Sequence, residues 1–145
     1  MHSVSFYTNE SDRLEVVHLW KTVFNYETAH NKPSLAIDKK LEAQDNLFFV
    51  ARVEKLIVGT ILAGYDGHRG WLYTVAVHPS HRKKGIGAAL VEHAERALIE
   101  RGCVKINLQI MGGNESVTGF YEALGYTVEP RVSMGKRIAQ NITPG

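Results

Sequence analysis

A basic, glycine-spaced run, Arg82-Lys83-Lys84-Gly85-Ile86-Gly87, has the residue types of an anion-binding site. It follows an apolar stretch, residues 71–77, and a proline-marked turn, and it leads into a stretch with helical periodicity. The first N–H groups of a helix have no intrahelical partners and lie at the positive end of the helix dipole. Because glycine has no side chain, Gly85 and Gly87 would let these groups approach a phosphate closely. The run therefore predicts a pyrophosphate site.

Three kinds of glycine-rich phosphate loop compete for this run. A nucleoside triphosphate loop requires G-x-x-x-x-G-K-[ST], and the chain has no such Gly-Lys-Ser or Gly-Lys-Thr ending here. A dinucleotide loop requires G-x-G-x-x-G, but Leu90 occupies the position of the third glycine. Both patterns therefore fail on composition, whereas the run satisfies a third pattern, R/Q-x-x-G-x-G/A.

A second block follows further along the chain, with Asn114 and then Phe120-Tyr121-Glu122-Ala123-Leu124-Gly125-Tyr126. Joined to the basic run, this block resembles the GNAT superfamily of acyl-CoA-dependent N-acetyltransferases. The resemblance covers about residues 3–138. The stretch from Gly64 to Gly70 and the ending Gly135-Lys136-Arg137 resemble the YpeA-like subgroup.

The resemblance implies an acetyl-CoA site and a catalytic acid. The pantetheine arm is expected between residues 71–77 and a parallel neighbouring strand, residues 104–110. The residues expected to hold the cosubstrate are Val75, Ala76, Val77, Arg82, Lys83, Lys84, Gly85, Ile86, Gly87, Ala88, Asn114 and Phe120. Tyr121 would protonate the departing thiolate, since a phenol with an ordinary pKa near ~10 carries its proton at neutral pH. The acceptor would be a primary amine on a small molecule or a protein.

The general base stays open at this stage. Several relatives place a glutamate on one of the two splayed strands, where this chain has Tyr73, Thr74 and Gln109. The proton could instead pass to water held by backbone carbonyl groups or to a residue from the acceptor-side loops. Candidates from these loops are Glu27, His30, Asp66 and His68. The missing carboxylate favours one rival function, a CoA-binding sensor or interaction module without turnover.

The wider pattern predicts the elements that position this site, in an α/β fold. We expect a GNAT-type mixed, mostly antiparallel central sheet of about seven strands with a splayed parallel pair, flanked by about four helices. The expected strands are residues 4–8, 47–53, 56–63, 71–77, 104–110, 126–128 and 132–137. The expected helices end near residues 24, 44, 101 and 124, and a tight Glu54-Lys55 turn predicts a hairpin.

Length and composition limit the remaining functions. A chain of 145 residues suggests a single domain. Its 17 basic and 15 acidic residues are too evenly balanced to indicate a nucleic-acid-binding surface. No signal peptide and no apolar run near the ~20 residues that span a bilayer are visible. One cysteine, Cys103, fits a reducing compartment, and no histidine pair has zinc-ligand spacing. We therefore expect a cytoplasmic protein without metal, and a homodimer is an open option because many relatives dimerise through their terminal strands.

Overall fold

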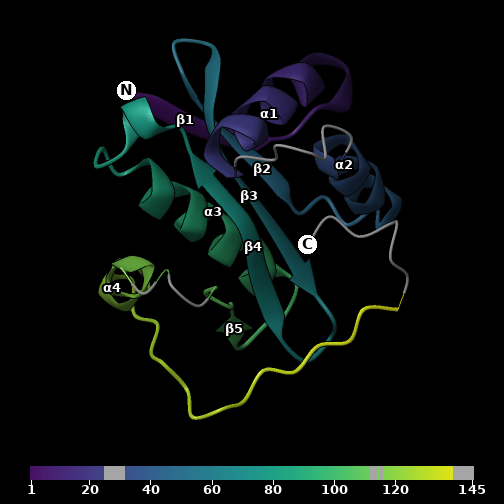
Figure 1. Cartoon of the computed structure of the whole chain (residues 1–145), viewed down its shortest axis with the longest axis vertical. Helices are drawn as coiled ribbons and strands as arrows, with labels where there is room; N and C mark the ends of the chain where they lie inside the picture. The colour runs from purple at the N-terminus through teal and green to yellow at the C-terminus, as the bar shows by residue number, and fades with distance from the viewer. Residues whose placement is uncertain (25–31, 112–113, 115, 139–145) are drawn as a thin grey trace.

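The computed structural model describes residues 1–24, 32–111, 114 and 116–138, which fold around one mixed sheet. The elements in chain order are β1 (His2–Phe6), α1 (Asn9–Phe24), α2 (Lys32–Glu42), β2 (Phe48–Val53), β3 (Leu56–Tyr65), β4 (Gly70–Val77), the 3₁₀ turn η1 (Pro79–His81), α3 (Ile86–Glu100), β5 (Ile106–Asn107) and α4 (Ser116–Ala123). Figure 1 shows α1 and α2 on one side of the twisted sheet and α3 on the other. The predicted α/β class is confirmed.

The strands lie in the order β1-β2-β3-β4-β5. The first three pairings are antiparallel, and β4 pairs with β5 in parallel. Between β2 and β3, Glu54 and Lys55 have φ angles of 50° and 74°. Two consecutive positive φ angles are typical of the two-residue turns that match the twist of antiparallel strands. The hairpin predicted from the sequence is thus confirmed.

Two apolar clusters hold the layers together, one on each face of the sheet. The cluster on the α3 face includes Phe49, Ile61, Leu90 and Leu98, all of them 0% exposed. The cluster on the α1 and α2 face includes Val16, Trp20 and Ile37 of the two helices together with side chains of β2, β3 and β4. Because successive strand residues face opposite ways, the continuous apolar runs of β2 and β3 supply both clusters.

The expectation of seven strands is wrong, since the described chain contains five. Residues 126–128 and 132–137 form no backbone ladder, and residues 104–110 pair with β4 only at Ile106 and Asn107. Pro130 interrupts the terminal segment, residues 126–137, and its backbone nitrogen cannot donate to a ladder. Val128 and Val132 are 76% and 88% exposed, so this segment lacks the buried face that would fix a strand register. Figure 1 shows the segment running away from α4 and around the lower end of the sheet.

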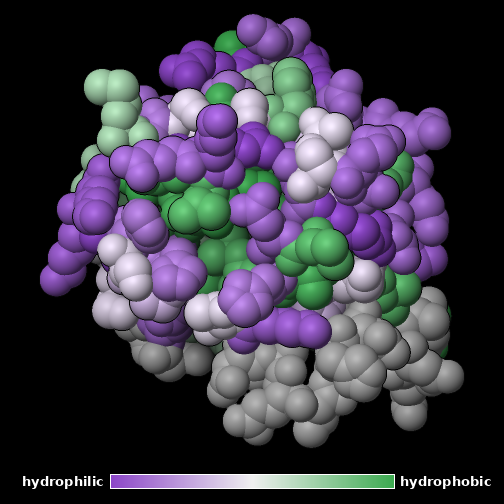
Figure 2. All heavy atoms as spheres, turned by 90° about the horizontal axis from the view of Figure 1, so that it is seen from above, coloured by the Kyte–Doolittle hydropathy of each residue, from purple (hydrophilic) through white to green (hydrophobic). Residues whose placement is uncertain are grey.

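The surface at the upper end of Figure 1 is largely hydrophilic. Figure 2 looks onto this end, where the β2–β3 hairpin, α1 and the turn after β4 lie, and shows apolar residues in the middle of a polar rim. Across the described ranges, no helix is both long enough and apolar enough to cross a bilayer.

Candidate active site

Strand β4 contains an extra residue between its two stretches of pairing with β3. Thr60 pairs with Ala76, whereas Leu62 pairs with Tyr73, so two steps along β3 face three along β4. Thr74, within this bulge, has a φ of 49°. The left-handed region is unfavourable for a β-branched residue, and such strain costs about 1–3 kcal/mol unless the surroundings enforce it. The bulge therefore changes the direction of the peptide groups at Val75, one of the residues predicted from the sequence to hold the cosubstrate.

A buried hydrogen-bond chain holds the bulge. Nε1 of Trp20 in α1 donates to Oγ1 of Thr60 over 2.8 Å, and Oγ1 of Thr60 donates to the carbonyl oxygen of Thr74 over 3.4 Å. Trp20 and Thr60 are 1% and 0% exposed. Sequence reasoning missed this role for both residues. The available signal was a single threonine in the apolar strand 56–63.

We expect Thr60→Val to destabilise the protein by about 1–3 kcal/mol, because the substitution keeps the side-chain shape but leaves the buried indole N–H without a partner. At this chain length the thermal unfolding midpoint should fall by about 2–4 °C for each kcal/mol lost. Thr60→Ser keeps the hydroxyl and is the matched control. Equal unfolding midpoints for Thr60→Val and the unmodified chain would show that this hydrogen-bond chain contributes nothing.

Strands β4 and β5 diverge after a short parallel contact. They pair only at Gly70 with Ile106 and at Trp71 with Asn107, while β4 continues to Val77. Val75, Ala76 and Val77 therefore lie on a stretch of β4 that has no β5 partner. Beside β5, a cleft of about 1300 Å³ extends to α4 and to residues 124–133, and its lining includes Trp71 and Tyr121. The predicted splayed pair is thus present, although its second strand is shorter than expected.

The turn after β4 presents free backbone donors at the start of α3. Gly85 is the N-cap with a φ of 81°, and no side chain caps the helix. The first bond of the helix runs from the N–H of Ala89 to the carbonyl of Gly85 over 3.0 Å. The N–H groups of Ile86, Gly87 and Ala88 therefore precede the helical ladder, which is the arrangement that binds anions.

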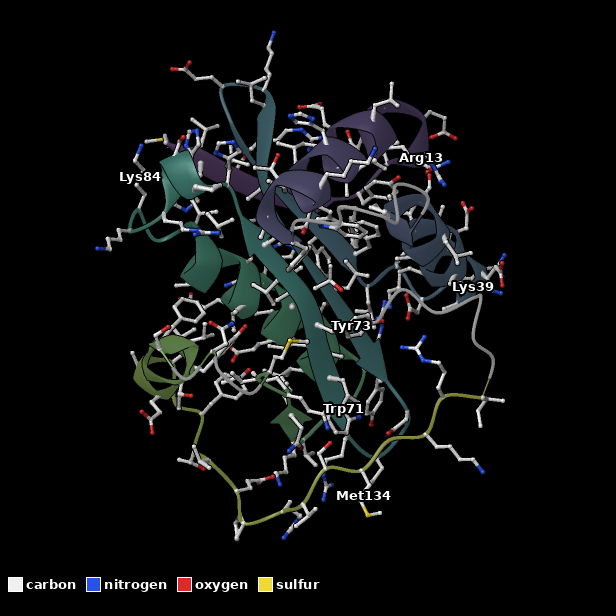
Figure 3. The ribbon with its side chains drawn as sticks, in the orientation of Figure 1. Arg13, Lys39, Trp71, Tyr73, Lys84 and Met134 are labelled. Carbon is white, nitrogen blue, oxygen red and sulfur yellow. The ribbon has the colours of Figure 1, made fainter. Side chains whose placement is uncertain are left out.

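Basic side chains surround this turn, but they are not equivalent. Nε of Arg82 donates to the carbonyl of Val77 over 3.1 Å, so this side chain ties the turn to the end of β4. Lys83 and Lys84 are exposed, and Figure 3 shows Lys84 at the outer edge of the molecule. Among the described residues, Nδ1 of His81 is buried without a hydrogen-bond partner. The turn thus combines positive charge with unused polar groups.

Helix α4 meets the start of α3 through Phe120. A Cβ atom on Gly87 would lie 3.1 Å from Cζ of Phe120 and 3.8 Å from Cγ2 of Val77. The structure therefore brings three predicted cosubstrate residues together from three elements. Asn114 is exposed in the loop before α4, where its carbonyl accepts the N–H of Val117. No described contact links the Asn114 side chain to β4.

Tyr121 is the buried residue of α4. It is 8% exposed, and its ring lies edge-on to Phe120 and to Tyr126, with centroids 4.8 and 5.8 Å away. Its hydroxyl has no hydrogen-bond partner within the described residues, whereas the hydroxyl of Tyr126 donates to Glu95 over 2.6 Å. Burial raises the pKa of Tyr121, so this phenol keeps its proton. Tyr121 also lines the cleft, and a protonated hydroxyl without a partner among the described residues is suited to act as an acid.

The candidate bases differ in their surroundings. Oδ1 of Asp66 accepts the backbone N–H groups of His68 and Arg69, both at 2.7 Å. The bond from Arg69 and then that from His68 hold the pKa of Asp66 below its usual value, so this carboxylate is committed to its turn. Gln109 donates to Oγ of Ser133 over 2.6 Å. Glu27 and His30 lie outside the described residues. In the part of the chain that the structure describes, no three His, Cys, Asp or Glu side chains gather as a metal site would require.

Comparison with known proteins shows that this chain is an acetyltransferase. It belongs to the acetyltransferase (GNAT) family, whose model matches residues 13–126. An acetyltransferase of Yersinia enterocolitica is 40% identical over 129 residues, which cover 89% of this chain and 91% of that protein. An acetyltransferase of Sodalis glossinidius is 42% identical over 128 residues, covering 88% and 89% of the two chains.

A solved structure with a similar fold contains coenzyme A. The PaiA N-acetyltransferase of Thermoplasma acidophilum, in complex with coenzyme A, superposes with a TM-score of 0.80 over 91% of this chain and 93% of that chain. The two sequences are 17% identical, so the likeness is one of fold.

Proposed function

We propose that this protein transfers the acetyl group of acetyl-CoA to a primary amine, on a small molecule or a protein, by direct attack in a ternary complex. The observation that carries this proposal is the uncapped start of α3, with Gly87 against Phe120, at the end of a bulged strand that diverges from its parallel neighbour. The name of the Yersinia relative and the coenzyme A in the PaiA structure support it.

The residues at this site fit coenzyme A. The N–H groups of Ile86, Gly87 and Ala88 would hold the pyrophosphate, with Lys83 and Lys84 adding charge. The free stretch of β4, residues 75–77, would pair with the pantetheine arm, and Phe120 would pack beside it. Hydrogen bonds to a charged group contribute about 1.5–3 kcal/mol each, so several at one helix start supply much of the affinity. We also assign Asn114 to the pantetheine arm, from its place before α4.

When bound, acetyl-CoA supplies a thioester that the amine attacks and a thiolate that departs. The N–H of Val75, which the bulge redirects, would donate to the oxygen on which negative charge develops. Tyr121 would donate its proton to the departing sulfur. The amine proton would pass to water held at backbone carbonyl groups, because Asp66 and Gln109 are engaged elsewhere. The site would thus act mainly by positioning the two substrates.

Calorimetry with acetyl-CoA, followed by thiol release over a panel of amines, tests this function. We expect binding in the range common for enzyme substrates, about 1 µM to 1 mM. ATP is the control ligand, because it carries adenosine phosphates but no pantetheine arm. If acetyl-CoA does not bind, the proposal is wrong. Binding without thiol release from any amine would favour the rival function, a CoA-binding sensor, which the lack of a carboxylate at Tyr73, Thr74 and Gln109 suggests.

Three further assignments belong to this proposal. The stretch from Gly64 to Gly70 and the ending at Arg137 support the YpeA-like subgroup. The free, buried Cys103 supports a reducing compartment, as expected in the cytoplasm. The exposed apolar residues of the terminal segment, Val128 and Val132, support a homodimer.

A further inference from the structure

Lys40 of α2 is buried, and its ammonium group is fully engaged. The side chain is 5% exposed. Its Nζ donates to Oδ2 of Asp45 over 2.9 Å, to the carbonyl of Ala63, and to Oη of Tyr73 over 2.9 Å. Because an ammonium has three N–H donors, these three acceptors use all of them. Lys40 is therefore placed to orient Tyr73 and not to bind a ligand itself.

Tyr73 links this buried ammonium group to the protein surface. It is 41% exposed, and its ring lies over Gly64, where a Cβ would be 3.6 Å from Cε1 of the ring. Since Oη accepts an N–H from Lys40, the hydroxyl proton is directed to another acceptor. In this structure Oη donates to the carbonyl of Ala63 over 3.5 Å, a long bond to an oxygen that also accepts from Lys40, so a stronger acceptor can replace it. Tyr73 is thus a hydroxyl donor polarised by an ammonium group.

Tyr73 lies next to the part of β4 where the proposed function places the reacting groups. Tyr73 immediately precedes the bulge and lies two positions before Val75. Figure 3 shows Trp71 and Tyr73 along β4, below α1 and toward the side of α2. An amine that reaches the cosubstrate at Val75 from this face of the sheet would pass the Tyr73 hydroxyl.

We propose that Tyr73, oriented by Lys40, binds a carboxylate group of the acceptor, so that the substrates are amines that also carry a carboxylate. The inference rests on the acetyltransferase function proposed above. A polarised hydroxyl donates most strongly to an anionic oxygen. Asp45 neutralises the charge of Lys40. The preference for a carboxylate therefore depends on the direction of the hydrogen bonds at Tyr73 more than on net charge.

Binding of matched amines tests this assignment without requiring turnover. NMR titrations, with and without coenzyme A, compare β-alanine with propylamine, glycine with ethylamine, and 4-aminobutanoate with butylamine. Each pair differs in its terminal carboxylate, and the three pairs cover three spacings from the amine. We expect at least one carboxylate member to bind about tenfold more tightly than its partner, the effect of one charge-assisted hydrogen bond. Tyr73→Phe should abolish this ratio.

Two control variants separate the hydroxyl and the charge from general effects on the fold. Tyr65→Phe removes a hydroxyl from the opposite face of the same sheet and should keep the ratio. Lys40→Met should abolish it, whereas Lys39→Met, at a neighbour whose side chain is 53% exposed, should not. Tyr73→Phe leaves the bonds of Lys40 to Asp45 and Ala63 in place, so it tests the idea even if Lys40→Met unfolds.

Two outcomes overturn the assignment: no carboxylate preference in any of the three pairs, or a preference that survives in Tyr73→Phe. Thiol release from acetyl-CoA with the same amines is measured in parallel. Its absence would contradict the acetyltransferase function, while the titrations without coenzyme A would still decide whether Tyr73 selects carboxylates.

Discussion

Gly87→Glu is expected to weaken acetyl-CoA binding by about 100-fold or more. The new carboxylate would stand among the N–H groups at the start of α3, where it would repel the pyrophosphate and compete for its donors. Losing two hydrogen bonds to a charged group at about 1.5–3 kcal/mol each corresponds to at least that factor, at about 1.4 kcal/mol per tenfold. Calorimetry with acetyl-CoA measures the change directly.

The variant should still fold, because a carboxylate in the first turn of a helix is stabilised by the helix dipole. Gly87→Ala is the matched control. Its Cβ would lie 3.1 Å from Cζ of Phe120, a contact that requires a shift of a few tenths of an ångström. We expect this smaller change to weaken binding by less than about tenfold. Equal affinities for Gly87→Glu and Gly87→Ala would place the pyrophosphate elsewhere.

Tyr121→Phe is expected to lower kcat by about 10²–10⁴-fold, the usual contribution of a positioned acid. The affinity for acetyl-CoA should stay unchanged, because the ring keeps its contacts with Phe120 and Tyr126. Steady-state thiol release gives kcat, and calorimetry gives the affinity. A retained kcat would mean that the thiolate leaves without a proton from Tyr121.

Tyr126→Phe provides the control for Tyr121→Phe, since it removes a neighbouring hydroxyl that is already bonded to Glu95. It should reduce stability by about 0.5–3 kcal/mol and leave kcat nearly unchanged.

The pH profile of kcat provides a second test of Tyr121. Burial raises the pKa of Tyr121, so its acid form persists to higher pH than that of a free phenol. Any loss of kcat from deprotonation of this group should therefore begin at a higher pH than for a free phenol, whose ordinary pKa is near ~10.

Local features of the fold were predictable because neighbouring residues decide them. The Glu54-Lys55 hairpin follows from the chemistry of a two-residue turn. The uncapped start of α3 follows from Gly85 and the basic run before it. Both features are confirmed, since φ preferences and free N–H groups depend on only a few residues along the chain.

The terminal strands show where such local patterns fail. Val132 and Met134 alternate with polar residues as in a strand, yet they are 88% and 91% exposed, and the segment forms no ladder. Strand alternation requires a partner strand and a buried face, and the residues concerned encode neither. The sequence thus overstated the size of the sheet.

By itself, the sequence determined the family resemblance and predicted the kind of ligand: the glycine spacing, the basic run and the block around Tyr121 predict coenzyme A and one acid. The tertiary structure decided which distant residues support this chemistry. Trp20 reaches Thr60 across 40 positions to hold the bulge, and Lys40 reaches Tyr73 across 33 positions. A single threonine in an apolar strand hints at a buried polar role, but the sequence does not identify its partner, because a buried donor takes whichever acceptor long-range packing brings to it.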